Sequence, residues 1–203
     1  MQLADEQKTD ARQADQTRER LLSAGLELLC KKGYRGATTR EIAQEAGVTE
    51  VTMYRHFRSK EELLATAVSD RGAQFLNIFP KPTGDMEADL LTLAQGFMDA
   101  LSSLPARLTR ILPELSQQED LLNALNDVTR RFREKGLELF RYYQDSGELR
   151  DDVDDVLFAA FTGPLHLRVL GGTAATEFSC GRFVTLFLDG CRPAKRGEPP
   201  QAP

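Results

Sequence analysis

The residues whose types and spacing could do chemistry gather between positions 38 and 64 of this 203-residue chain. Tyr54, His56 and Lys60 carry hydrogen-bond donors that suit the oxygens of a phosphate. Glu50 is an acceptor, and a glutamate in a major groove can accept a hydrogen bond from the amino group of cytosine. These residue types predict recognition of a nucleic acid.

Three helix starts in the same segment would position these side chains. Thr38 and Ser59 are each followed, three residues later, by a glutamate, and each pair forms a capping box. Thr49 is a third cap, and Gly47 is suited to end the helix before it. A short helix, a turn with glycine and a second short helix are typical of a helix-turn-helix, whose second helix enters the major groove of DNA.

The second short helix is expected to have one buried and one exposed face. Met53 and Phe57 are four residues apart, so we expect both to point inward. The outward positions are then Glu50, Val51, Thr52, Tyr54 and Arg55. Two interpretations of Glu50 stay open: it reads a cytosine, or it is a first-turn charge that stabilises the helix dipole and points to solvent.

Residues 38–63 meet every fixed position of the pattern T-T-x-x-I-A-x-x-A-G-V-(S/T)-x-x-x-x-Y-x-x-F-x-x-K-x-x-L. In these residues the sequence resembles the tetracycline-repressor family of bacterial regulators. The resemblance implies a three-helix DNA-binding domain followed by a larger helical domain for ligand binding and dimerisation. Members of the family act as homodimers on near-palindromic double-stranded operators, most often as repressors that a small molecule releases.

Carried over to this chain, the resemblance places Arg40, Glu50, Val51 and Thr52 toward bases and Thr39, Tyr54, His56 and Lys60 toward phosphates. The complete set of predicted DNA contacts is Thr38, Thr39, Arg40, Thr49, Glu50, Val51, Thr52, Tyr54, Arg55, His56 and Lys60. The alternative for the whole segment is a helical packing motif that does not bind DNA.

Apolar residues recur along the chain with helical rather than strand periodicity, which predicts an all-α protein. Beyond the segment already described, helices are expected at about 15–32, 85–104, 116–146, 153–170 and 174–189. The expected organisation is a disordered arm at 1–14, a helix-turn-helix domain with its linking fourth helix at 15–76, an effector-binding and dimerisation domain at 77–191, and a disordered tail at 192–203.

The family resemblance implies an effector pocket in the larger domain. Few charges interrupt the apolar stripes there, which favours an apolar or aromatic effector over an anionic one. The residues predicted to surround it are Phe75, Phe79, Phe97, Met98, Leu101, Phe132, Phe140 and Tyr143. Each of these residues could equally belong to the plain core.

The last two predicted helices resemble the dimerisation elements of the family. They carry more apolar residues than one helix face buries, which predicts a second buried face between two copies. The predicted interface residues are Phe158, Phe161, Leu165, Phe178, Val184, Phe187 and Leu188. The alternative is again the domain core. His166 lies among them, and we interpret it as a hydrogen-bonded core or interface histidine rather than a ligand contact.

Charge is unevenly distributed along the sequence. The net charge is −5, yet residues 31–60 hold seven basic and three acidic residues, whereas residues 61–203 hold 15 basic and 22 acidic ones. A basic segment near the start of an acidic chain is compatible with a small polyanion-binding module on a larger body.

Other classes of function have little support in the sequence. Only two histidines are present, and there is no glycine-rich phosphate loop, nucleophile elbow or metal-spaced cluster, so neither an enzyme nor a metal or other cofactor is expected. Three distant cysteines and the lack of an 18-residue apolar run predict a reduced, cytoplasmic protein outside the membrane. A protein-interaction module remains as an alternative to the DNA-binding regulator.

Overall fold

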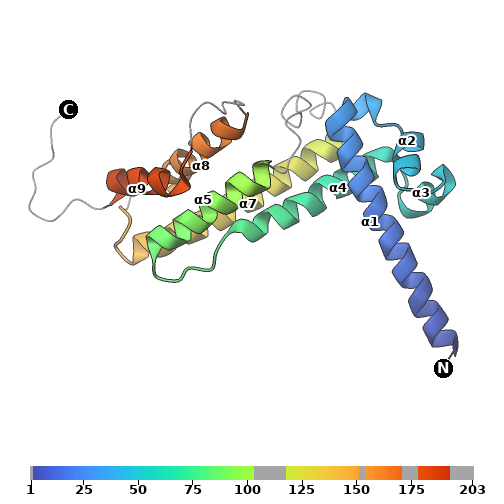
Figure 1. Ribbon diagram of the computed structural model, residues 1–203, viewed down its shortest axis with the longest axis horizontal. Helices are drawn as coiled ribbons and strands as arrows, with labels where there is room; N and C mark the ends of the chain where they lie inside the picture. The colour runs from blue at the N-terminus through green and yellow to red at the C-terminus, as the bar shows by residue number, and fades with distance from the viewer. Residues whose placement is uncertain (1, 103–117, 151–153, 171–177, 193–203) are drawn as a thin grey trace, which may run out of the picture. The chain divides into compact units, whose positions relative to one another are not determined.

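Helices form every element in the part of the chain that the structure describes (Figure 1). The structure is a computed structural model, and it describes residues 2–102, 118–150, 154–170 and 178–192. The elements are α1 (Gln2–Gly36), α2 (Thr39–Glu45), α3 (Glu50–His56), α4 (Lys60–Phe75), the 3-10 helix η1 (Leu76–Ile78), α5 (Met86–Ser102), α7 (Glu119–Asp145), α8 (Asp154–Leu170) and α9 (Cys180–Cys191). The prediction of an all-α fold is confirmed.

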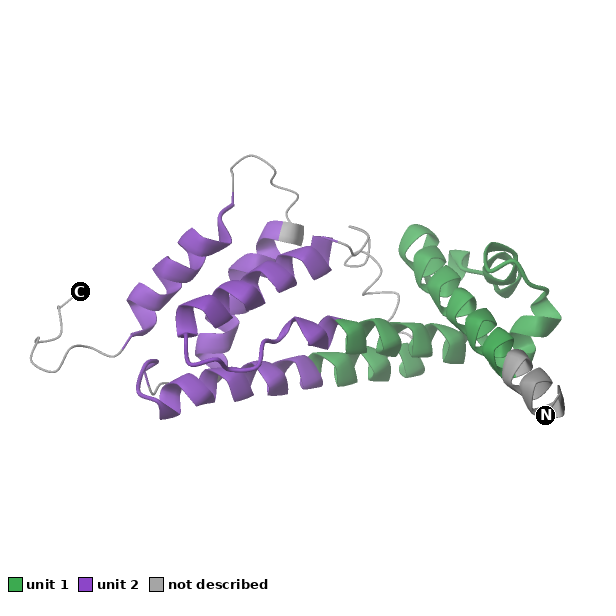
Figure 2. Cartoon of the chain, turned by 60° about the horizontal axis from the view of Figure 1, so that its bottom comes forward, with its two compact units in different colours: residues 1–74, 105–129 green, residues 75–104, 130–203 purple. Residues whose placement is uncertain are grey.

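The chain divides into two compact units, which Figure 2 colours green and purple. Unit 1 comprises residues 1–74 and 105–129, and unit 2 comprises residues 75–104 and 130–203. Helix α7 therefore contributes its first turns to unit 1 and its remaining turns to unit 2. The sequence predicted a boundary near residue 76, but it did not predict that a later segment belongs with the first unit.

Helix α1 differs from its prediction at one end and agrees with it at the other. Residues 2–14 are helical where the sequence predicted a disordered arm. The stretch has no glycine and no proline and is rich in alanine, glutamine and charged residues, which favour a helix. At the other end Gly33 has a φ of 74°, a left-handed conformation that glycine adopts readily, so the chain bends where the sequence predicted a helix end.

Unit 1 has its own hydrophobic core. Its largest buried side chains come from four helices and include Leu21, Leu29, Ile42, Met53, Phe57, Leu63 and Leu64. Leu121, from the first turn of α7, has no exposed surface and packs in the same core together with Ala124. Gly72 of α4 is also close to α7, because a Cβ atom at this position would overlap the side chain of Val128.

Aromatic rings fill the centre of unit 2. The ring of Phe132 on α7 has its centroid 4.9 Å from that of Phe79, 5.1 Å from that of Phe75 and 5.6 Å from that of Phe97. All eight predicted effector-pocket residues lie in or against this core: Phe97, Phe132, Phe140 and Tyr143 are buried, and Phe75, Phe79, Met98 and Leu101 are partly buried. An effector among them stays a prediction.

His166 of α8 lies against the same core. Its ring meets the ring of Phe97 edge-on, with the centroids 4.7 Å apart, and its Nδ1 atom is 3.1 Å from the carbonyl oxygen of Thr162. Burial lowers the pKa of His166, so the neutral imidazole is favoured. This arrangement agrees with the interpretation of His166 as a hydrogen-bonded core histidine.

The packing of α8 and α9 places the predicted dimer-interface residues in or against the core of the single chain. Six of the seven predicted residues are buried within the single chain, in the core of unit 2: Phe158, Phe161, Leu165, Val184, Phe187 and Leu188. Phe178 precedes α9, which begins only at Cys180 with Ser179 as its cap, and packs against the same core. This burial accords with the alternative that these residues form the domain core, and their contact with a second copy stays a prediction. Among the large apolar side chains that the structure describes on these two helices, Val156, Leu167 and Leu186 are exposed, by 63%, 72% and 65%.

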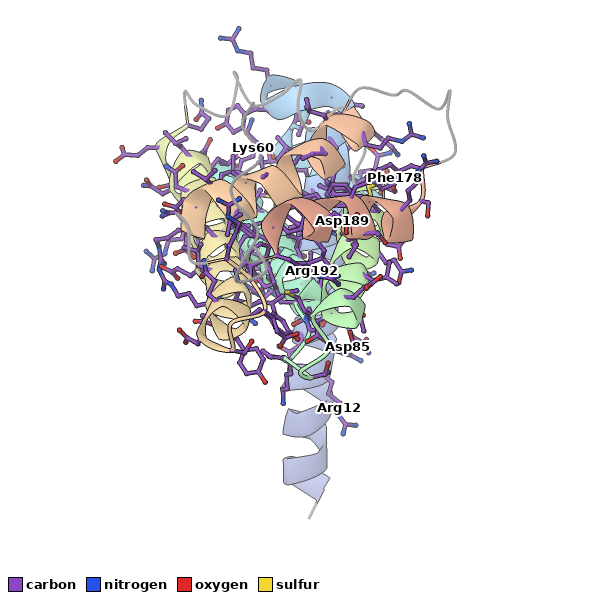
Figure 3. The ribbon with its side chains drawn as sticks, turned by 90° about the vertical axis from the view of Figure 1, so that its left-hand side faces the viewer. Arg12, Lys60, Asp85, Phe178, Asp189 and Arg192 are labelled. Atoms are coloured by element: carbon purple, nitrogen blue, oxygen red, sulfur yellow. The ribbon has the colours of Figure 1, made fainter. Side chains whose placement is uncertain are left out.

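Helices α5 and α9 run antiparallel in unit 2. Asp85 marks the start of α5, where its carboxylate accepts a hydrogen bond from the Ala88 amide. Arg192, at the end of α9, has its guanidinium 3.8 Å from the carboxylate of Glu87 near that same start (Figure 3 labels Asp85 and Arg192). The rest of the predicted tail, residues 193–203, lies outside the described residues.

A buried carboxylate joins the start of α5 to α7. Asp89 is almost fully buried and accepts three hydrogen bonds: from the Thr83 amide at 2.8 Å, from the Thr83 hydroxyl at 2.8 Å and from the hydroxyl of Tyr143. Burial and the bond to Asp89 raise the pKa of Tyr143, so its phenol stays protonated and donates. The three bonds attach residue 83 and helix α7 to one point on α5.

We expect Gly136→Ala to lower the free energy of unfolding by about 1–3 kcal/mol, the usual cost of overpacking a core. A Cβ atom at Gly136 would overlap the ring of Phe158, which itself packs between Phe132 and Phe140. Thermal and urea unfolding of the variant will measure this loss.

The matched control is Gly190→Ala in α9. A Cβ at Gly190 meets nothing within 4 Å and the next residue is not a proline, so this change should be neutral or stabilise by up to about 1 kcal/mol, because alanine is the better helix former. Equal effects of the two substitutions would show that α7 and α8 are not in close contact at Gly136.

None of the helices within the described ranges combines the length and the apolar composition that crossing a membrane requires.

Candidate DNA-binding surface

The start of α2 is fixed by the capping box that the sequence predicted. The Thr38 hydroxyl accepts from the Glu41 amide at 3.3 Å, and the Glu41 carboxylate accepts in return from the Thr38 amide at 3.4 Å. The other oxygen of Glu41 lies 3.0 Å from the Lys32 ammonium near the end of α1. These hydrogen bonds lower the pKa of Glu41, and the bond from Lys32 has the largest effect.

A glycine turn connects α2 to α3. Gly47 has a φ of 67°, and the Val48 amide donates to the Ala43 carbonyl at 2.9 Å to close the turn. Thr49 then caps α3, since its hydroxyl accepts from the Thr52 amide at 3.2 Å and is 2.9 Å from the Thr52 hydroxyl. The prediction of two short helices around a glycine turn is confirmed.

Helix α3 presents the two faces that its sequence predicted. Met53 has no exposed surface, and Phe57, which follows the helix, is also buried. On the other side Val51 is 66% exposed and Tyr54 is 51% exposed. Large apolar and aromatic side chains at such exposure are available to a partner, and a thymine methyl group or a DNA backbone suits them.

Lys60, labelled in Figure 3, is held at the start of α4 by a residue of α1. Its ammonium donates to the Tyr34 carbonyl at 3.0 Å and lies 3.8 Å from the centre of the Tyr34 ring. An ammonium group has three N–H bonds, so this contact orients Lys60 and leaves capacity for a phosphate oxygen.

The hydroxyl of Tyr34 donates to the carboxylate of Glu61, next to Lys60. This bond lowers the pKa of Glu61, while burial and the same bond raise the pKa of Tyr34. Tyr34 is therefore a support for the predicted phosphate contact at Lys60. The sequence did not predict this role, because Tyr34 lies 26 residues before Lys60 and no local pattern connects the two.

The first turns of α2 and α3 are joined by a side-chain hydrogen bond. The Thr39 hydroxyl donates to the Glu50 carboxylate at 2.5 Å. Glu50 lies at the edge of a surface groove between the two helices, which is lined by Arg40, Ala43, Gln44, Gly47, Val48, Thr49 and Glu50. Two of its lining residues, Arg40 and Glu50, belong to the predicted DNA contacts and carry opposite charges.

The structure leaves all eleven predicted DNA contacts at least partly accessible. Thr38, Arg40, Thr49, Glu50, Val51, Tyr54 and Arg55 are exposed, and Thr39, Thr52, His56 and Lys60 are half-buried. Their contact with DNA stays a prediction.

Two family descriptions match the chain. Residues 21–67 match "Bacterial regulatory proteins, tetR family", and residues 80–186 match "Tetracyclin repressor-like, C-terminal domain". The first range covers the end of α1, all of α2 and α3 and the first half of α4, and with them the candidate DNA-binding surface. The second covers most of unit 2.

Similar proteins over most of the chain are transcriptional regulators by name. The HTH-type regulator YvkB of Bacillus subtilis is 26% identical over 182 residues, which cover 86% of this chain and 96% of YvkB. The HTH-type repressor KstR2 of Rhodococcus jostii is 24% identical over 184 residues, which cover 85% and 90% of the two chains. The HTH-type regulator SrpR of Pseudomonas putida is 29% identical over 183 residues, covering 90% and 78%.

Solved structures share the fold. A regulator from Mesorhizobium loti described as tetR-family superposes with a TM-score of 0.69 at 19% identity, covering 89% of this chain and 98% of that one. FadR of Bacillus subtilis, solved in complex with stearoyl-CoA, superposes with a TM-score of 0.67 at 19% identity, covering 84% and 95%.

Proposed function

Because the chain belongs to the tetR family of bacterial regulatory proteins, whose members bind DNA through a helix-turn-helix, we propose that it is a homodimeric repressor released from its operator by a small molecule. The operator is a near-palindrome, since two identical copies present two identical reading helices related by a two-fold axis. The protein acts in the cytoplasm, where bacterial operators lie.

Helix α3 gives the main support for DNA reading. Its buried residues Met53 and Phe57 hold it in the core of unit 1, while Val51, Tyr54 and Arg55 project from the opposite side. A rigidly held helix with an exposed face of mixed apolar, aromatic and cationic character suits base edges and phosphates together.

Leu167 and Leu186 support the dimer. Each lies on one of the last two helices of unit 2, and each exposes about two thirds or more of its surface in the single chain. An isologous dimer would cover the same pair of leucines on both copies. In the operator-bound dimer the two α3 helices should lie about 34–36 Å apart, or a multiple of this distance, to enter successive major grooves on one side of the DNA.

The aromatic core of unit 2 supports an apolar or aromatic effector. Phe75, Phe79, Phe97 and Phe132 pack their rings together and offer an apolar, aromatic surface. An effector acts by favouring a dimer whose α3 helices are no longer spaced for the operator, which requires a coupling of only about 1–3 kcal/mol between the two sites. FadR, which shares the fold, holds stearoyl-CoA, so long-chain acyl compounds belong in the first set of effectors to test.

Selection of an operator from a random duplex pool at physiological salt tests the proposal. The wild-type protein should enrich an inverted repeat, and a Tyr54→Ala, Lys60→Ala double variant should lose that enrichment, because it removes two predicted backbone contacts from a surface that is otherwise intact. Removing the Lys60 charge from both copies of the dimer should also reduce the magnitude of the slope of log affinity against log salt by about 1.8, which is about 0.9 for each copy.

A Tyr142→Ala, Lys135→Ala double variant is the matched control. These residues are an exposed tyrosine and an exposed lysine of α7 in unit 2, so the same chemical changes there should leave the selected sequence and its affinity unchanged. A wild-type protein that is folded and dimeric but enriches no sequence would contradict the proposed function.

A further inference from the structure

Glu50 is the one acidic residue among the eleven predicted DNA contacts, and its position is unfavourable for phosphate binding. It is exposed in the first turn of α3, where an approaching phosphate would be repelled. A carboxylate at this place needs a role that offsets the repulsion.

The bond from Thr39 restricts the Glu50 side chain. An exposed glutamate normally samples many rotamers, but the Thr39 hydroxyl holds one carboxylate oxygen at 2.5 Å. Thr39 has a single hydroxyl proton, and this proton is directed at Glu50 rather than at a phosphate oxygen. The bond therefore makes Thr39 a positioning residue for the carboxylate.

The carboxylate keeps acceptor capacity after this bond. Two oxygens offer about four lone-pair sites, and Thr39 uses one of them. In the major groove cytosine presents only an amino donor, whereas guanine presents the acceptors N7 and O6 and thymine presents the acceptor O4. Adenine offers its amino donor beside the acceptor N7, which a carboxylate repels. Cytosine is thus the base that a fixed carboxylate matches best.

We propose that Glu50, positioned by Thr39, is a specificity-determining residue that selects one cytosine in each half-site. The inference rests on the proposed DNA-binding function and adds the base and the residue pair that reads it. Arg40 lines the same groove, so its cation reduces the cost of bringing an acid to DNA.

The competing role for the same hydrogen bond is purely structural. The bond would then only tie α2 to α3, and the charge of Glu50 would only stabilise the start of α3 through the helix dipole. Base preference separates the two roles, because a structural tie has no effect on which base is selected.

Operator selection with the wild type, Glu50→Gln and Thr39→Val tests the proposal. The wild type should require cytosine at one symmetric position in each half-site, with about 5- to 150-fold discrimination against the other bases. Glu50→Gln should lose this requirement and select adenine there, because an amide pairs with the N6 and N7 atoms of adenine. Thr39→Val should weaken the cytosine requirement without creating a new one, because the carboxylate of Glu50 is then no longer held in position.

A modified operator tests the same contact with the unaltered protein. Placing N4-methylcytosine at the selected position blocks the amino donor in the major groove, so wild-type affinity should fall about 5- to 150-fold while Glu50→Gln is insensitive to the methyl group. Unchanged base preference of Glu50→Gln at every position, or unchanged wild-type affinity for the methylated operator, would overturn the role of Glu50. A wild type that selects no operator would instead count against DNA binding itself.

Discussion

Replacing Leu167 and Leu186 with aspartate should leave a folded monomer whose affinity for the operator is lower by a factor of about 100 or more. Linking two DNA-binding domains in a dimer raises the affinity by about 10²–10⁴, and the monomer loses this gain. Both side chains project from the last two helices at 72% and 65% exposure, so the folded single chain tolerates a charge at either position. A dimer would bury these charges without partners, which opposes association strongly. Sedimentation equilibrium will measure the mass, and fluorescence anisotropy with operator DNA will measure the affinity.

Leu122→Asp is the control for this double variant. Leu122 is another exposed leucine, on the first turns of α7 in unit 1, away from α8 and α9 in the sequence. It should leave the dimer intact. A Leu167→Asp, Leu186→Asp protein that remains dimeric at micromolar concentration would show that the copies associate through other surfaces.

Asp89→Ala should lower the free energy of unfolding by about 3–4 kcal/mol, because it leaves three donors without their acceptor and each unsatisfied donor costs about 1–1.5 kcal/mol, at the low end of the usual range. The donors are the Thr83 amide, the Thr83 hydroxyl and the Tyr143 hydroxyl. For a chain of this size the Tm should fall by roughly 6–16 °C. Differential scanning calorimetry and urea titration will measure both quantities.

Tyr143→Phe gives a graded comparison for Asp89→Ala. It removes one donor of the three and keeps the ring in the core of unit 2, so the loss should be about 1–1.5 kcal/mol. If Asp89→Ala lowers the free energy of unfolding no more than Tyr143→Phe does, the two bonds from Thr83 contribute nothing measurable. Hydrogen bonds from Thr83 to water would then replace them without loss.

Local signals in the sequence predicted the helices around the candidate site well. The threonine caps at 38 and 49, the turn at Gly47 and the inward pair Met53 and Phe57 depend on residues within four positions of one another, and all are confirmed. At Ser59 the cap also forms, although the carboxylate of Glu62 accepts from the Arg58 amide at 2.7 Å, one residue earlier than a standard capping box requires.

Contacts between distant residues were not predictable in this way. The Thr39 to Glu50 bond and the Lys60 to Tyr34 contact join positions 11 and 26 residues apart, and no spacing rule connects them. The same limit applies to the apolar residues of α8 and α9. An excess of apolar residues indicates burial, but it does not tell whether the core of the same chain or a second copy covers them.

The position of Leu121 in the core of unit 1 limits how the DNA-binding part of this protein can be moved into a chimaera. A fragment cut after α4 retains all eleven predicted DNA contacts but loses Leu121 and Ala124, which fill part of the core beneath them. Such a fragment would expose the apolar side chains that Leu121 and Ala124 cover in the intact protein. An effector domain taken from another protein would therefore need a leucine at the position that corresponds to Leu121. The part that can be exchanged is therefore discontinuous in sequence. A transfer of the DNA-binding unit has to include the first turns of α7, residues 119–129, together with residues 2–74.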